Sequence, residues 1–339
     1  MRTLYSIFGL ILISIISHAQ YLTKYPEIPR IDVHTHVSNS YPGIVNYLAM
    51  RDSLIAIHKI DVAMWINLNE RKGGETGIDT INEVSKGRIM TTISDFSPHR
   101  GLTHKPADLA GYLKEGYVGY KIWHGPSSRV LKEGEEGIKY IDNPAHEQVL
   151  TEMEKVGMVM ASVHIADPNG PFGNRGRWEA DPVEFWRQVM GLERVLQRHP
   201  NLVVVAAHCS WLVCQDAQID YLRYLLSTYP NLYVDLAATF NYYYLVNQDN
   251  LRDFMVQFSD RILYGTDEGI YADKSTISKH ATQYSNTFQV LETDDLSTGR
   301  NPIRGLNLPR EVLENIYYKN ALKIYPGLAN RMRLLGYKI

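Results

Sequence analysis

Short strand-like stretches decide the fold of this chain, and Ile31-Asp32-Val33-His34-Thr35-His36 is the first of them. The stretch is short and partly β-branched, which predicts a strand. Its two histidines then lie at the C-terminal end of that strand. Seven further stretches rich in β-branched or aromatic residues follow along the chain. The eight predicted strands cover residues 31–33, 62–68, 88–93, 119–123, 159–164, 202–208, 232–235 and 262–266.

Segments with the apolar period of an amphipathic helix separate these strands, one of them over Pro182–Arg198. Alternating strands and helices are typical of a parallel sheet with crossover helices. Polar residues at the strand ends recur about every 33 residues, near the ~31 residues per unit of a 250-residue barrel. A doubly wound sheet would normally have a glycine-rich phosphate turn after its first strand, which this sequence lacks. We therefore predict an α/β fold, a (β/α)8 TIM barrel, as a single domain over residues 20–339.

The overall composition excludes two classes of protein. Of the 339 residues, 45% are hydrophobic and 21% are charged, so the chain can bury a core and is not intrinsically disordered. The formal net charge is −2 and no Lys or Arg block stands out, which argues against nucleic-acid binding by bulk electrostatics. Cys209 and Cys214 are too few for a disulfide scaffold, and we expect buried free thiols. The expected partner is a small-molecule substrate, and a homo-oligomer is compatible with the sequence.

The first 19 residues predict a secretory signal peptide. Arg2 supplies a positive start, Ile7–Ile16 is nearly all apolar, and Ser17 and Ala19 are small residues at −3 and −1 of a cut after Ala19. A membrane anchor is the alternative, but this apolar run is shorter than the roughly 20 residues that a bilayer span needs. We expect a periplasmic or secreted mature protein without a membrane span.

Several polar side chains at the predicted strand ends suit a metal ion. Residues two apart in an extended chain point the same way, so we expect His34 and His36 to face the barrel mouth together. Such a pair alone is a weak signal, because paired histidines also occur by chance. Three other strands end at His164, His208 and Asp267, all on the face where barrel enzymes keep their active sites. Three histidines and one aspartate suit zinc or another divalent first-row metal.

These motifs resemble the amidohydrolase superfamily, in its amidohydrolase-related branch. The resemblance rests on Asp32-Val33-His34-Thr35-His36, His164, His208, Gly265-Thr266-Asp267 and a closing helix at Leu313–Ala321. It implies one divalent metal, zinc by preference, and the expected ligands are His34, His36, His164 and Asp267. It also implies that His208 either holds a second metal or acts on the substrate as an acid or base.

Lys121 ends the strand Gly119–Trp123, where binuclear amidohydrolases have a carboxylated lysine that bridges two metals. For the related branch the resemblance implies an unmodified lysine and one metal. A lysine inside a barrel mouth is costly unless it is paired or modified. A carbamate, a cation that binds substrate oxygen and a surface-facing side chain all remain open. We favour the cation with one metal per chain, and a second metal at Lys121 and His208 is the alternative.

The ligand set favours a metal-dependent hydrolase. A divalent metal lowers the pKa of bound water from 15.7 toward ~7. We expect Asp267 to orient that water and carry its proton to the leaving group, and His208 to stabilise an oxyanion. The bond would be an amide, ester or lactone. A metal-dependent lyase of the same family, a decarboxylase or hydratase, is the runner-up, and a barrel that binds a ligand without catalysis is the third interpretation.

Loop residues give weaker indications of the substrate. His124 follows the fourth strand, Arg175 and Arg177 follow the fifth, and Phe240–Tyr244 follows the seventh. Cationic side chains favour a carboxylate or another anion, and aromatic ones favour a sugar or aryl face. Ordinary loop packing is the alternative for each residue. We predict a small, anionic, sugar- or aryl-like substrate bound by Lys121, His124, Arg175 and Arg177.

Overall fold

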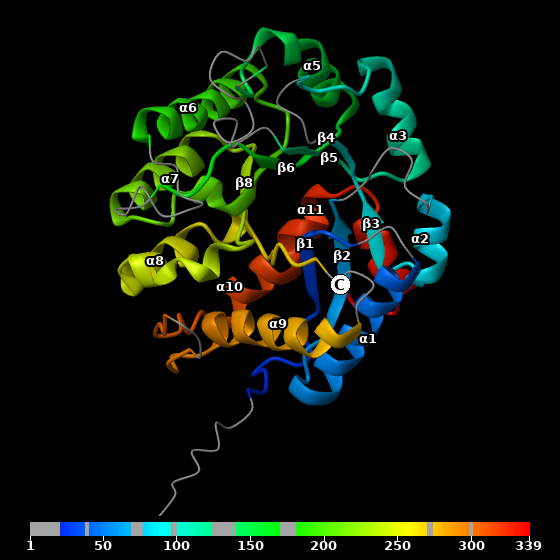
Figure 1. Cartoon of the computed structure of the whole chain (residues 1–339), viewed down its shortest axis with the longest axis vertical. Coiled ribbons are helices and arrows are strands. Elements are labelled where there is room, and N and C mark those ends of the chain that lie inside the picture. The colour runs from blue at the N-terminus through cyan, green and yellow to red at the C-terminus, as the bar shows by residue number, and fades with distance from the viewer. Residues whose placement is uncertain are drawn as a thin grey trace, which may run out of the picture.

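A ring of helices surrounds the strands in the computed structural model (Figure 1). The structure describes residues 21–37, 41–68, 77–95, 100–123, 138, 140–169, 181–269, 274–297 and 301–339. Its strands are β1 (Arg30–Thr35), β2 (Val62–Asn67), β3 (Ile89–Thr91), β4 (Ile93–Asp95), β5 (Tyr120–Trp123), β6 (Met160–His164), β7 (Val204–Ala206), β8 (Leu232–Asp235) and β9 (Ile262–Leu263). The predicted signal peptide lies outside the described residues.

The helices follow the strands in the alternating order that the sequence predicts. They are α1 (Tyr41–His58), α2 (Ile78–Val84), α3 (Leu109–Glu115), α5 (Glu147–Val156), α6 (Pro182–Arg198), α7 (Asp216–Thr228), α8 (Gln248–Gln257), α9 (Ile277–Glu292), α10 (Arg310–Glu314), α11 (Asn320–Ile324) and α12 (Leu328–Leu334). Within the described residues, no helix has both the length and the apolarity that crossing a bilayer demands.

All strand pairs are parallel, in the orders β1-β2-β3 and β4-β5-β6-β7-β8-β9. Only Thr92 separates β3 from β4, and its N–H donates to the Asn67 carbonyl (3.0 Å), so the two segments form one continuous barrel strand. The six-stranded sheet in turn meets β1, because the Val33 N–H donates to the Tyr264 carbonyl (3.0 Å). The Asp267 N–H likewise donates to the His34 carbonyl (2.8 Å). The predicted TIM barrel of eight strands is confirmed.

Helix α6 shows why these sequences become barrel helices. Its bounds, Pro182–Arg198, are those the apolar period predicts, and the Asp181 side chain caps it by accepting the Val183 N–H at 2.8 Å. Phe185 and other apolar residues of one face are buried against the barrel. Val183 and Met190, which belong to the same predicted stripe, are instead 76% and 40% exposed, so the stripe is broader than the buried face.

The barrel interior is filled by its own small apolar cluster, with members such as Ile31, Val205 and Leu263. Tyr325, which follows α11, also belongs to this cluster. The Tyr325 hydroxyl donates to the Ala161 carbonyl at 3.1 Å. A larger cluster lies between the strands and the surrounding helices. With apolar side chains in the interior, the polar groups at the strand ends are left to line one end of the barrel.

The two cysteines belong to the larger cluster, and their burial agrees with the prediction from the sequence. Cys209 and Cys214 are buried free thiols. Burial raises the pKa of the Cys209 thiol well above its usual value, so this side chain stays protonated and acts as packing rather than as a nucleophile.

Candidate metal centre

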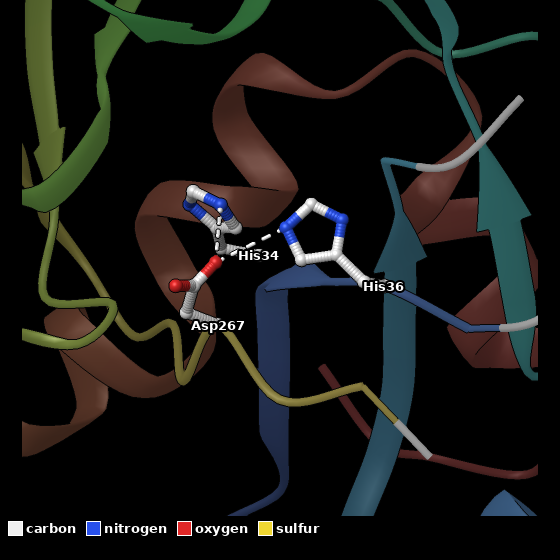
Figure 2. Close-up of side chains that lie close together, drawn as sticks. All are labelled: His34, His36 and Asp267. Carbon is white, nitrogen blue, oxygen red and sulfur yellow. Dashed lines mark hydrogen bonds and ion pairs between the residues drawn. The ribbon is translucent and has the colours of Figure 1, made fainter. Parts of the chain in front are cut away.

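Three donor atoms converge where β1 ends and the chain leaves β9 (Figure 2). The Nε2 atoms of His34 and His36 lie 3.2 Å and 3.1 Å from the same oxygen, Oδ1 of Asp267. The three residues can each offer a ligand atom within 4.8 Å of the others. His34 is fully buried, while the side chains of His36 and Asp267 are 23% and 35% exposed. The cluster is thus closed behind His34 and open on the side of the other two residues.

Backbone irregularity brings these side chains together. The register of β1 shifts between Asp32 and Thr35. Asp267 has a left-handed backbone with φ of 67°, a conformation that is uncommon for non-glycine residues and is enriched at active sites. The buried Asp32 carboxylate holds both segments, because it accepts the N–H groups of His34 (3.0 Å) and Thr266 (3.2 Å). Asp32 therefore positions the two sides of the cluster relative to each other.

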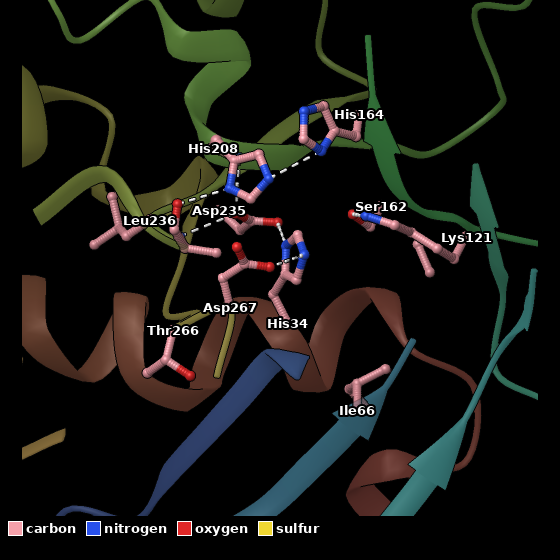
Figure 3. Close-up of polar contacts among 12 residues, drawn as sticks. His34, Ile66, Lys121, Ser162, His164, His208, Asp235, Leu236, Thr266 and Asp267 are labelled. Atoms are coloured by element: carbon pink, nitrogen blue, oxygen red, sulfur yellow. Dashed lines mark hydrogen bonds and ion pairs between the residues drawn. The ribbon is translucent and has the colours of Figure 1, made fainter. Parts of the chain in front are cut away.

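Asp235, at the end of β8, orients His34 from behind (Figure 3). Its Oδ2 lies 2.8 Å from Nδ1 of His34, and its Oδ1 accepts the N–H of His208 at 2.9 Å. Burial opposes charge on both groups, but their mutual attraction wins: the pKa of His34 is raised and that of Asp235 is lowered. Because Nδ1 of His34 is hydrogen-bonded to the Asp235 carboxylate, its Nε2 faces Asp267.

The donor set fits a divalent metal ion. The buried Nε2 of His34 makes no hydrogen bond, although an oxygen of Asp267 lies 3.2 Å away. Burial would raise the pKa of Asp267, but the adjacent imidazoles of His34 and His36 bring it well below its usual value, so this carboxylate is anionic. Two imidazole nitrogens, one carboxylate oxygen and an Asp–His pair behind the first ligand are the parts of a zinc-type site.

His164 and His208 form a second cluster in the same barrel mouth (Figure 3). Nε2 of His208 lies 3.3 Å from Nδ1 of His164. The opposite nitrogen of each ring donates to a backbone carbonyl, that of Ala237 (2.8 Å) and that of Ala166 (2.9 Å). A carbonyl only accepts, so the two facing nitrogens both carry lone pairs. Burial lowers the pKa of His208 to about 4 and that of His164 well below its usual value, which leaves two unprotonated nitrogens that attract a cation.

Of the four expected ligands, the structure thus brings His34, His36 and Asp267 together and places His164 beside His208. The sequence led us to expect that His208 stabilises an oxyanion, or that it acts as an acid or base or holds a second metal. With its Nδ1–H held by Ala237, the neutral ring instead directs an acceptor nitrogen toward the site. That geometry suits a metal ligand or a proton acceptor.

Lys121 points into the barrel, so the surface-facing interpretation does not hold. It is 1% exposed, and its ammonium donates to the Ser162 hydroxyl at 2.9 Å. Burial lowers the pKa of Lys121 to about 8, against the opposing attraction of Asp267 and Asp235. The amine is therefore more readily neutral than that of an exposed lysine, which keeps both the cationic and the carbamate form chemically accessible.

Sequence reasoning missed Asp235 and two tryptophans. Asp235 was visible as a polar residue at a strand end, but nothing in the sequence links it to His34 across the barrel. Trp211 stacks on His208 with ring centroids 4.4 Å apart, and Trp123 meets His164 edge-on at 6.0 Å. The aromatic rings pack beside the second histidine cluster and hold its imidazoles. His124, Arg175 and Arg177 lie outside the described residues.

Comparisons with known proteins agree with this architecture. An uncharacterized TIM-barrel protein from Bordetella bronchiseptica matches with a TM-score of 0.54 and 14% identity, over 90% of this chain and 99% of that one. A putative metal-dependent hydrolase from Lactobacillus casei matches with a TM-score of 0.50 and 12% identity, over 94% of this chain and 100% of that one. At such low identity these similarities show the fold alone.

The curated proteins contain no match to this sequence. The sequence model of one family, described as Amidohydrolase, does match residues 134–327. That range is more than half of the chain and includes His164, His208, Asp235 and Asp267, while His34 and His36 precede it. The matched sequence and the barrel with its cluster of histidines and aspartates lead to one conclusion: the chain belongs to the amidohydrolase family.

Proposed function

We propose that this protein is a metal-dependent hydrolase that activates water to attack an amide, ester or lactone carbonyl. The observation that carries the proposal is the convergence of His34 Nε2 and His36 Nε2 on Asp267 Oδ1, with Asp235 bonded behind His34. In this proposal His34, His36 and Asp267 hold one zinc ion and His164 completes the set. The bound metal would supply a water molecule whose pKa lies near 7.

The chain's own residues supply the proton transfers and the substrate contacts. Asp267 stays ionised and its side chain is 35% exposed, so it can take a proton from the nucleophile and pass it to the leaving group. His208 directs its acceptor nitrogen into the same mouth and accepts a proton or a hydrogen bond there. Lys121, when protonated, binds an anionic oxygen of the substrate.

The substrate in this proposal is small, anionic and sugar- or aryl-like, bound also by His124, Arg175 and Arg177. We further propose that residues 1–19 are removed and that the mature protein is periplasmic or secreted, a location that rests on the N-terminal sequence. Mass spectrometry of the protein from cell fractions tests this: an N-terminus at Met1 in the cytoplasmic fraction would contradict it.

Two measurements test the activity. Elemental analysis of protein produced with added zinc should find one ion per chain, and absence of metal together with no activation by divalent ions would refute the proposal. A panel of lactones, amides, esters and aryl acids should then show metal-dependent release of acid. Release of carbon dioxide without acid would reassign the protein as a lyase.

The variants His208→Asn and Lys121→Ala determine the number of ions. With one ion, both variants keep one ion per chain, and His208→Asn lowers turnover by about 10²-fold or more, the size of a lost proton acceptor. Lys121→Ala weakens substrate binding or turnover, and short-chain acids with bicarbonate do not restore it. Two ions per wild-type chain, with half lost in His208→Asn and rescue of Lys121→Ala by such acids, would establish a carboxylated lysine instead.

A further inference from the structure

A pocket of about 220 Å³ lies next to the metal centre but is not lined by its ligands. Thr266 and Glu268, the neighbours of Asp267, form part of its wall, while Asp267 itself does not. The remaining wall comes from the loop after β8, from the α9 helix and from Ser297, Asn301 and Ile303. The pocket is smaller than the roughly 300–1,000 Å³ of drug-sized sites, so it suits a ligand group of about one ring.

Side-chain amides make up half of the polar residues that line this wall, and hydroxyl side chains make up most of the rest. Gln283 and Asn286 come from α9, and Asn241 and Asn301 come from the flanking loops. The side chains of Gln283 and Asn286 have no hydrogen bond to any residue that the structure describes. An amide both donates and accepts hydrogen bonds, as a ligand hydroxyl does. These side chains are therefore available to a ligand rich in hydroxyl groups.

Apart from Glu268, the rest of the described lining is uncharged. Phe240, Val290 and Ile303 supply apolar surface, on which the C–H face of a sugar ring can pack. Among the lining residues that the structure describes, Glu268 is the only charged one, and its carboxylate is paired with His280 Nδ1 at 2.5 Å. A charged ligand would find no unpaired opposite charge there and would lose its hydration on entry.

From this lining we propose that the pocket binds a neutral polyhydroxylated ring, of the monosaccharide class. The amides of Asn286 and Gln283 bond its hydroxyl groups, and Phe240 packs against its C–H face. The site goes beyond the proposed hydrolase activity, because none of the metal ligands takes part in it. It accepts either a free sugar or the sugar portion of a larger substrate, since the chemistry recognised is the same.

Titration calorimetry on the full mature protein tests the assignment, with glucose, galactose and N-acetylglucosamine as neutral probes. Glucuronate and glucosamine serve as the charged counterparts. We expect saturable binding of at least one neutral sugar, and weaker binding of its charged counterpart. Absence of saturable binding by all three neutral sugars, or tighter binding of a charged probe, would overturn the proposal.

Helix α9 offers matched variants. Asn286→Leu and the exposed Gln283→Leu each remove one amide from the pocket and should weaken sugar binding about tenfold, which is the loss of one or two hydrogen bonds. Gln289→Leu changes an amide on the same helix that does not line the pocket, and it should bind sugar like the wild type. Unchanged affinity in both pocket variants, or equal loss in Gln289→Leu, would contradict the assignment.

Metal content is measured on the same samples, so the two proposals fail separately. Sugar binding by a protein that takes up no metal would leave the pocket assignment intact and remove the hydrolase. A protein that binds metal but no sugar would refute the pocket assignment and leave the hydrolase proposal intact. Competition by a sugar in the hydrolase assay identifies a substrate subsite, whereas binding without competition identifies a separate ligand site.

Discussion

The two ends of strand β1 carry buried polar clusters of opposite character. Arg30 begins the strand and His34 lies near its end, and both side chains are fully buried and face a carboxylate. At the first end, the Arg30 guanidinium meets Oε1 of Glu292 at 2.9 Å. At the other end, Nε2 of His34 meets Oδ1 of Asp267 without a hydrogen bond. In the first cluster the carboxylate is paired with a cation of the chain itself, whereas the carboxylate of the second faces only imidazole nitrogens.

The contacts around the two carboxylates explain the difference. Glu292 also accepts hydrogen bonds from Tyr21 (2.6 Å), Thr23 (2.7 Å) and Tyr317 (3.0 Å), so its charge is satisfied by donors of this chain. Asp267 faces two imidazole nitrogens and keeps a third of its side chain exposed. In TIM barrels the end at which the strands start contributes to stability and the end at which they finish carries the chemistry. Strand β1 follows this rule: the buried Arg30–Glu292 pair at its start is satisfied by the chain, and the His34–Asp267 pair at its end is open to a ligand.

The strongest test of the contrast between the two ends of β1 is to replace Asp267. We expect Asp267→Asn to lose bound metal and to lower turnover about 10⁴-fold, the upper range for a general base, without a comparable loss of stability. Elemental analysis, turnover and denaturant unfolding measure the three effects. Asp260→Asn, an exposed carboxylate shortly before β9, is the control. Full metal content in Asp267→Asn would contradict the assignment of this end to chemistry.

A substitution at Glu292 tests the Arg30 end of strand β1, where we expect an effect on stability and none on metal binding. Glu292→Gln leaves the buried Arg30 without its counter-charge, which should lower the free energy of unfolding by about 3–5 kcal/mol, while folded protein keeps its metal. The control Glu314→Gln breaks an exposed pair with Arg310 and should change the free energy of unfolding by less than about 1 kcal/mol. Similar values for both variants, from urea titrations, would show that the Arg30 cluster does not stabilise the barrel.

Asp235 tests the contrast between the two ends of β1 in another way, because it contacts His34 and is not one of the proposed metal ligands. Asp235→Asn removes the carboxylate behind His34 Nδ1 and should weaken zinc binding about 10- to 100-fold, as such supporting contacts usually do. Competition with a chromophoric chelator measures the affinity. Wild-type affinity in this variant would mean that the ring orientation of His34 is set by packing alone.

The smallest effect is a pH dependence of zinc binding. Burial lowers the pKa of His34, but the charge of Asp235 outweighs it and raises the pKa above 6.5. Below this raised value the ring holds a proton that zinc must displace, so affinity should rise with pH, by up to about tenfold per unit, and level off above it. In Asp235→Asn the levelling should occur at lower pH. Chelator competition across pH values checks this, and a wild-type plateau beginning below pH 6.5 would contradict it.

The repeated pattern of the chain was enough to predict the eight strands and helix α6, because strand and helix periods depend on neighbouring residues. The same pattern led to His34, His36 and Asp267, since parallel strands in a barrel end on one face. It was not enough to predict the pairing of Asp235 with His34, which lie 201 residues apart in sequence. Nor could it predict that His164 would face His208, because ring orientation depends on the carbonyls of Ala166 and Ala237.

By itself, the sequence determined which side chains reach the mouth of the barrel, since periodicity and strand ends are local properties. The tertiary structure alone decided what each of those side chains does there. It gave His34 a carboxylate behind it, left two lone pairs between His164 and His208, and enclosed Arg30 among donors and acceptors of its own chain. The physical reason is that protonation, tautomer and charge depend on groups within a few ångströms, and in a closed barrel those groups come from distant strands.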